Sequence, residues 1–349
     1  MKCIEAHHRP STRKVYHNHW EDWKNWCSSN NVKDPVRPRS HQVANYMAYL
    51  SQSKKLSAST LKTRKAAIAS VMKTAGVKDV TQSVTVSQVI SGAENMQPPK
   101  DKFVPQWDIA VILNYLKGKS FRTNKELSLP ALSYKTSFLI ALASGRRVSE
   151  ISNLSGLKED VSHSPDGSIT LKFLPDFLAK NQSPSDPSPQ ILIKPLNRSV
   201  DPDQEDISIC PVRALNEYRR RTDSIRSPSQ RALFISMKPS HSSDLSRASI
   251  SRWLKSLIRS AYMALGRVGK NLPNQESRPR SVRAHEIRAW AATMASKTTP
   301  LTEVMKAAYW KTSTVFIRHY LRDVSRRSEC GKQRLPAMVA AQSVVGARH

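Results

Sequence analysis

The chain has 349 residues and a formal net charge of +29, from 56 lysines and arginines against 27 acidic residues. Its 39% apolar residues exclude a disordered polycation, and no run of about 18 apolar residues predicts a membrane-spanning helix. The first ten residues are polar, so we expect no signal peptide, and the four scattered cysteines predict reduced thiols in an intracellular protein. So large a positive charge indicates a polyanionic partner, with nucleic acid the first candidate.

The first part of the chain predicts a compact helical unit. Only 10 glycines occur in the whole sequence, and apolar residues recur at helical spacing. We expect four helices here, near residues 13–28, 41–51, 59–75 and 83–94. The first carries Trp20, Trp23 and Trp26 as a stripe, which fits a buried helix face better than a base-stacking platform.

A proline-rich segment over residues 97–105 then interrupts the periodicity and predicts a linker. Beyond it we expect helices near residues 107–116, 131–144, 212–221, 249–264, 284–297 and 301–308. Residues 168–174 and 190–194 alternate in polarity and predict a β-hairpin with a Ser/Pro-rich connection. The predicted organisation is a helical domain, a linker, a mixed α/β domain and a tail: residues 1–97, 98–106, 107–330 and 331–349.

Three motifs in the second domain suit chemistry on phosphates. In the first, SGRRVSE, Arg147 lies between a helix that ends at Gly145 and one that begins at Val148. An arginine at such a junction can present a planar fork of donors to a phosphate. An isolated GRR sequence is more often a surface feature, so this motif alone decides nothing.

The second motif is His285-Glu-Ile-Arg288, inside a predicted helix, where the i, i+3 spacing brings histidine and arginine to one face. A neutral histidine can move a proton near pH 7, and an arginine can hold phosphate oxygens. By itself this pattern more often marks a solvated helix face.

The third motif follows an apolar Val-Phe-Ile step and contains Tyr320 among Arg318, His319 and Arg322. Positive neighbours favour the phenolate form of a tyrosine. A lone tyrosine at helical spacing is more often packed on a core.

In combination, the order Arg, Lys, His-x-x-Arg, Trp, Tyr resembles the tyrosine recombinase (phage integrase) family. The resemblance covers about two thirds of the chain, and the N-terminal helices resemble that family's core-binding domain. The stretches DISICPVRALNEY and WKTSTVFIRHYLRD are most similar to recombinases of eukaryotic mobile elements of the DIRS and crypton groups. The fold implied is mainly α with a small β-hairpin or sheet: an all-helical core-binding domain and a mixed α/β catalytic domain.

The resemblance also implies a role for the motif residues. Arg147 and Arg288 would hold the nonbridging phosphate oxygens, with Glu150 supporting Arg147. His285 would handle the proton of Tyr320, the nucleophile that forms a 3′-phosphotyrosine link. No carboxylate pair is implied, so neither a metal nor another cofactor is expected.

Three further assignments follow from the resemblance. Lys180 is the best candidate for the catalytic lysine, although Lys172 or Lys194 remains possible because a Ser/Pro-rich loop replaces the usual hairpin turn. Trp310 stands where most members have histidine, and would bind a phosphate oxygen or pack against the site. Four more basic residues are expected to bind DNA: Lys62, Arg64, Lys65 and Arg146.

The function implied is site-specific cleavage and rejoining of double-stranded DNA, for a mobile element, by a homodimer or tetramer without membrane association. The expected location is intracellular, and nuclear in a eukaryotic host. Two alternatives stay open: a type IB topoisomerase that relaxes supercoils, and a catalytically inactive recombinase derivative that only binds DNA.

Overall fold

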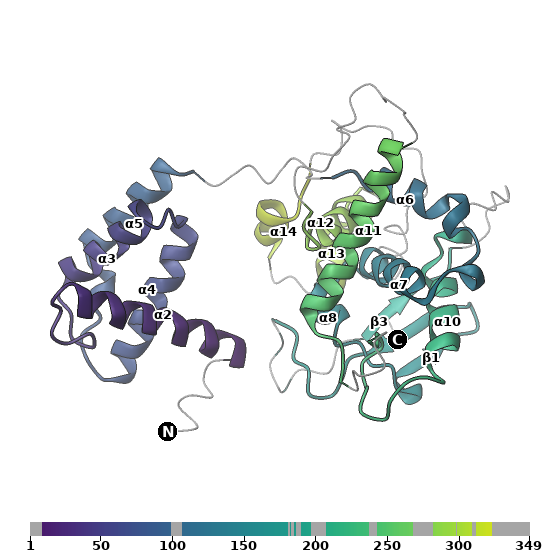
Figure 1. Cartoon of the computed structure of the whole chain (residues 1–349), viewed down its shortest axis with the longest axis horizontal. Coiled ribbons are helices and arrows are strands. Elements are labelled where there is room, and N and C mark those ends of the chain that lie inside the picture. Colours follow the sequence, from purple (N-terminus) through teal and green to yellow (C-terminus); the bar gives the residue numbers. More distant parts are fainter. Residues whose placement is uncertain are drawn as a thin grey trace. The chain divides into compact units, whose positions relative to one another are not determined.

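In this computed structural model the chain divides into two compact units, Met1–Asp101 and Lys102–His349, each with its own apolar core (Figure 1). The structure describes residues 9–98, 107–180, 182, 185, 190–196, 207–236, 243–267, 282–297, 299–308 and 312–322. Nearly all of the predicted linker and the whole predicted tail lie outside these residues. No helix in the described part of the chain has the length and apolar character needed to cross a membrane.

The first unit contains the four predicted helices: α2 (Pro10–Ser29), α3 (Ser40–Gln52), α4 (Ala58–Thr74) and α5 (Val84–Met96). Helix α2 begins earlier than predicted, because Pro10 fits the first turn, where a missing N–H costs nothing. Trp23 is fully buried and packs on Tyr46, with ring centroids 5.0 Å apart, while Trp20 and Trp26 lie partly buried on the same core. The predicted core role is confirmed for Trp23, whereas Trp20 and Trp26 keep part of their surface exposed.

The second unit is built around α7 (Leu129–Ser144), which is buried along most of its length and packs most extensively against three other helices. These are α10 (Pro211–Thr222), α11 (Arg247–Arg267) and α12 (Glu286–Ala295). The remaining helices are α6 (Ile109–Lys117), α8 (Val148–Ile151), α13 (Leu301–Ala308) and α14 (Ser313–His319). The helical expectations are confirmed in type, and the mainly α fold class is confirmed with them.

A three-stranded antiparallel sheet lies beside these helices, in the order β1 (Val161–His163), β2 (Ile169–Lys172), β3 (Gln190–Ile193). The predicted hairpin is the β2–β3 pair, in which Leu171 faces Ile191. The sequence analysis missed β1, because three residues are too few to show an alternating pattern. The long β2–β3 connection contains Lys180, whose placement matters for the site described next.

Candidate active site

The turn between α7 and α8 places Arg147 at a helix junction, as predicted. Gly145 ends α7 with φ +60°, a left-handed conformation that favours glycine. Arg147 is the N-cap of α8 and is held by Glu150 at both ends: its backbone N–H donates to Oε2 at 3.2 Å, and its Nη1 donates to Oε1 at 2.8 Å. The local sequence therefore fixes the orientation of this guanidinium.

Glu150 joins the first motif to the second. Its side chain is fully buried, with Nη1 of Arg146 and Nη1 of Arg288 each 3.9 Å from Oε2, in addition to the contact with Arg147. A buried carboxylate is stable only when it is paired, and three guanidinium groups supply the pairing here. The Glu150 carboxylate therefore contacts both Arg147 and Arg288, the two arginines that the sequence analysis assigned to phosphate binding.

Arg288 lies at the centre of the site. Its side chain is 1% exposed, and its Nη1 donates to the carbonyl oxygen of Gly145 at 2.8 Å. The guanidinium carbon lies 5.2 Å from the ring centroid of Tyr320, within the range of a cation–π contact. Burial, followed by the nearby charge of Arg147, lowers the pKa of Arg288 to about 10, so the group remains cationic at neutral pH.

His285 and Tyr320 are in direct contact. Nε2 of His285 lies 3.1 Å from the Tyr320 hydroxyl, and the ring centroids are 5.2 Å apart. The sequence analysis placed His285 inside a helix over residues 284–297, whereas α12 begins at Glu286 and His285 is its N-cap. Its helical dihedral angles (φ −67°, ψ −20°) preserve the predicted i, i+3 relation to Arg288.

The surroundings keep His285 neutral. Burial lowers the pKa of this imidazole to about 4, assisted by the charges of Arg288 and Arg147 and, to a smaller extent, of Arg322 and Lys180. The protein groups packed around the imidazole desolvate it, although the residue as a whole is exposed to solvent. At pH 7 a neutral imidazole protonated at Nδ1 would accept the Tyr320 O–H at Nε2, which is the arrangement a general base needs.

This lowered pKa predicts a pH-dependent loss of stability. In the unfolded chain a histidine takes up its proton near pH 6.5, whereas the folded His285 does so only near pH 4. Between these values the unfolded state binds more protons, so stability falls as the pH falls. We therefore compare the free energies of unfolding of the wild type and of His285→Gln. The difference between them should be constant above about pH 6.5, and the wild type should lose stability relative to the variant from there to about pH 4. Urea titrations of both proteins test this, and a difference that does not change with pH would contradict it.

Both the backbone and the ring of Tyr320 are held in place by contacts with neighbouring residues. It caps the C-terminus of α14, is 7% exposed, and packs with Phe316 and Ala289. The Thr293 hydroxyl on α12 donates to the Tyr320 carbonyl at 3.1 Å and accepts the Arg322 backbone N–H at 3.1 Å. The segment that carries the predicted nucleophile is therefore bound to the helix that carries Arg288.

A buried ion pair also attaches this segment to α12. Nε of Arg322 lies 2.6 Å from Oε1 of Glu286, and both side chains are 7% exposed. The sequence analysis counted Arg322 among the cations near Tyr320, and in the structure this guanidinium is paired with Glu286. Sequence reasoning missed Glu286 and Thr293 because their partners lie 36 and 27 residues away along the chain.

The three candidate lysines are placed differently. Lys180 is exposed, and its charge is among those that act on His285. Lys172 lies at the end of β2 with its Nζ 3.9 Å from Asp160, and the charge of Lys194 acts on Asp166. Of the three, Lys180 has the placement that suits a role in this site. Trp310, with Tyr309, lies outside the described residues.

The four predicted DNA-binding residues divide into two kinds. Lys62 and Lys65 lie on α4 in solvent-exposed contacts with Glu94 at 2.7 Å and Gln82 at 3.4 Å, which phosphates can replace at small cost.

Arg64 and Arg146 are less accessible. Arg64 donates to Asp22 at 2.7 Å and to the Tyr46 hydroxyl at 3.1 Å. Arg146 is 5% exposed and lies 6.0 Å from the Phe173 ring centroid, which disfavours the direct DNA contact predicted for it. Burial beside Glu150 instead gives Arg146 a place in the packing of the site.

Comparison with known proteins identifies the fold. A λ integrase tetramer bound to a Holliday junction matches with a TM-score of 0.50 and 15% identity, over 95% of this chain and 78% of that one. The Tn1549 transposon integrase in complex with transposon right end DNA matches with a TM-score of 0.50 and 14% identity, over 90% of each chain. The chain has the fold of the tyrosine recombinases. No protein-family model and no curated protein matches it by sequence. The tyrosine recombinase fold predicted from the motifs is thus confirmed.

Proposed function

We propose that this protein cleaves and rejoins double-stranded DNA through a 3′-phosphotyrosine intermediate. One observation carries the proposal: the Tyr320 hydroxyl lies 3.1 Å from a neutral His285, beside the guanidinium of Arg288. The same Glu150 that contacts Arg288 holds Arg147. A nucleophile, a base and two anion-binding groups therefore lie together in one small region.

The reaction follows from the chemistry of these groups. The Tyr320 oxygen attacks the phosphorus of a phosphodiester, the bond to the 5′ oxygen breaks, and the tyrosine becomes linked to the 3′ phosphate. His285 takes the phenolic proton, and Lys180 supplies a proton to the departing 5′ oxygen. Arg147 and Arg288 bind the nonbridging oxygens more strongly as negative charge develops on them in the transition state. Attack of a 5′ hydroxyl on the same phosphorus reverses these steps and rejoins a strand.

Charge and fold support DNA as the substrate. A net charge of +29 favours binding through the release of counterions from phosphates. The λ integrase and Tn1549 integrase structures compared above were solved on a Holliday junction and on transposon right end DNA. We propose that this chain, too, acts on DNA, as a dimer or tetramer, for a mobile element of the DIRS or crypton type. The nucleus is the location this implies in a eukaryotic host.

The arrangement of these groups bears differently on the two predicted alternatives. A derivative that only binds DNA has no chemical need for a neutral histidine at hydrogen-bond distance from a tyrosine among paired arginines. Type IB topoisomerases use similar groups, so relaxation of supercoiled DNA without a preferred site would favour that alternative over strand exchange.

The covalent complex provides the test. A pool of duplexes with randomised sequence, each nicked so that the cleaved end diffuses away, should trap the protein on DNA in the presence of EDTA. Trapping should not need a divalent metal, because the Glu150 carboxylate is already shared by three guanidinium groups and the proposed mechanism assigns no pair of carboxylates to a metal. Denaturing electrophoresis of labelled DNA detects the product. Strict dependence of trapping on magnesium would contradict the proposed mechanism.

A further inference from the structure

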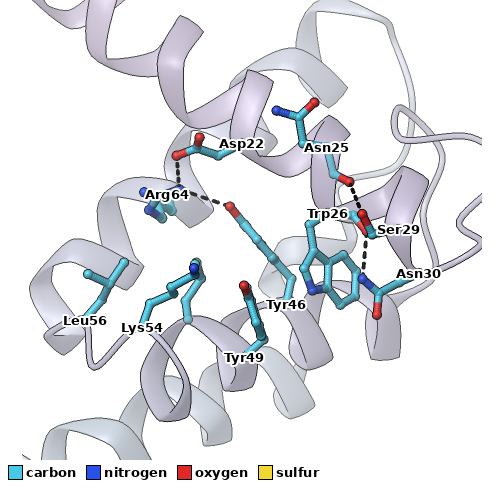
Figure 2. A pocket seen from close by; sticks show the side chains of 11 residues that line it. Asp22, Asn25, Trp26, Ser29, Asn30, Tyr46, Tyr49, Lys54, Leu56 and Arg64 are labelled. Carbon is cyan, nitrogen blue, oxygen red and sulfur yellow. Dashed lines mark hydrogen bonds and ion pairs between the residues drawn. The ribbon is translucent and has the colours of Figure 1, made fainter.

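The helical unit Met1–Asp101 contains a cavity of about 650 Å³ that the reaction above does not use (Figure 2). Residues of α2, α3 and α4 and of the turn between α3 and α4 line it. Its volume is within the range of cavities that hold small molecules, which is about 300–1,000 Å³. The cavity opens to solvent, so a ligand attached to a longer chain could enter it.

Aromatic rings form much of the lining. Trp26 stacks on Trp23, with centroids 5.5 Å apart and an interplanar angle of 16°, and lies 5.3 Å from Tyr46. The Tyr49 side chain borders the same space and is 36% exposed. Figure 2 shows Trp26, Tyr46 and Tyr49 side by side along the cavity. Flat apolar faces of this kind accept a planar ring, and base–aromatic stacking does not require a particular base.

Charged and polar groups occupy the rest of the lining. The ammonium of Lys54 lies 5.8 Å from the centroid of the Tyr49 ring. Arg64 donates to Asp22 and to the Tyr46 hydroxyl, so the positive charge of Arg64 is already paired with a carboxylate in the cavity. Asn25 adds an amide that can donate and accept hydrogen bonds. A planar ring with polar edges and an attached anion matches this lining in shape and charge.

We propose that this cavity binds one unpaired nucleotide of DNA, with its base against Tyr49 and Trp26 and its phosphate at Lys54. This proposal rests on the proposed function for its biological ligand, because strands that are cut and exchanged must separate before they rejoin. Bases of an intact duplex are stacked on their neighbours, so only a single-stranded or extruded nucleotide can enter. The cavity thus recognises a DNA structure that strand exchange itself creates.

Binding of a fluorescein-labelled oligothymidylate to the full chain, carrying Tyr320→Phe to prevent cleavage, tests the proposal. Tyr49→Ala should weaken binding about tenfold, the scale of losing one base–aromatic stack, whereas Tyr49→Phe keeps the ring and should bind like the parent. Lys54→Ala should also weaken binding. Lys33→Ala removes an exposed lysine of the same unit that does not line the cavity, and should change affinity far less.

An oligonucleotide of abasic sites separates stacking from charge, since it retains the phosphates. It should bind the parent more weakly than oligothymidylate does. This difference between the two oligonucleotides should be smaller in Tyr49→Ala, which keeps only the Trp26 part of the stack. Equal affinity of the parent for both oligonucleotides, or no loss in Tyr49→Ala, would overturn the proposal. These measurements need no cleavage, so their failure is distinguishable from a failure to form the covalent complex.

Discussion

Tyr320→Phe is expected to abolish the covalent DNA complex while folding and DNA binding survive. The substitution removes one oxygen and leaves the ring that packs on Phe316 and Ala289. The hydrogen bond lost to His285 is worth about 1 kcal/mol of stability, a small part of the total for a folded domain. Cleavage has no other route, because phenylalanine has no atom that can form the link to phosphorus. Trapping on nicked duplexes measures the effect, and a gel-shift assay confirms that DNA is still bound.

Tyr309→Phe is the matched control, because both tyrosines flank the same short segment of the sequence. It should still form the complex. Protease digestion of the trapped wild-type adduct, followed by mass spectrometry, should place the DNA on the peptide that contains Tyr320. Recovery of DNA on Tyr309, or an adduct that persists in Tyr320→Phe, would show that the nucleophile is wrongly assigned.

Elements with strong local signals were predictable from the sequence. Helix α7 contains an apolar run and ends at Gly145, which has the left-handed conformation that favours glycine. Its bounds were therefore close to those predicted, and Arg147 was placed correctly beside it. Strand β1 has only three residues and no such signals, and it forms because β2 offers it a partner.

Much of the candidate site depends on contacts that no local pattern encodes. The sequence indicated that Glu150 supports Arg147, three residues away, but not that its carboxylate also approaches Arg288. The Glu286–Arg322 ion pair likewise joins residues far apart in the sequence. Such pairs arise when α8, α12 and the end of α14 pack together, so only the tertiary structure shows them.

Arg288→Lys and Arg147→Lys should each slow formation of the covalent complex by about 100-fold or more, with DNA binding little changed. Lysine keeps the positive charge but loses the planar fork that reaches two oxygens at once. Loss of one preorganised donor at a developing negative charge typically costs a factor of about 100–1,000 in rate. Single-turnover trapping rates on nicked duplexes measure this effect.

Arg146→Lys provides the control that separates chemistry from packing. Like Arg288, Arg146 is buried with its Nη1 3.9 Å from Glu150, but its burial disfavours the DNA contact that the sequence analysis expected of it. If the three arginines act only through their packing and hydrogen-bond geometry around Glu150, all three lysine variants should lose activity to a similar extent, and thermal unfolding should shift with it. If Arg147 and Arg288 bind the phosphate, Arg146→Lys should retain most of the trapping rate. Full activity in Arg288→Lys or Arg147→Lys would mean that the phosphate contacts another residue, because neither variant could still offer the fork.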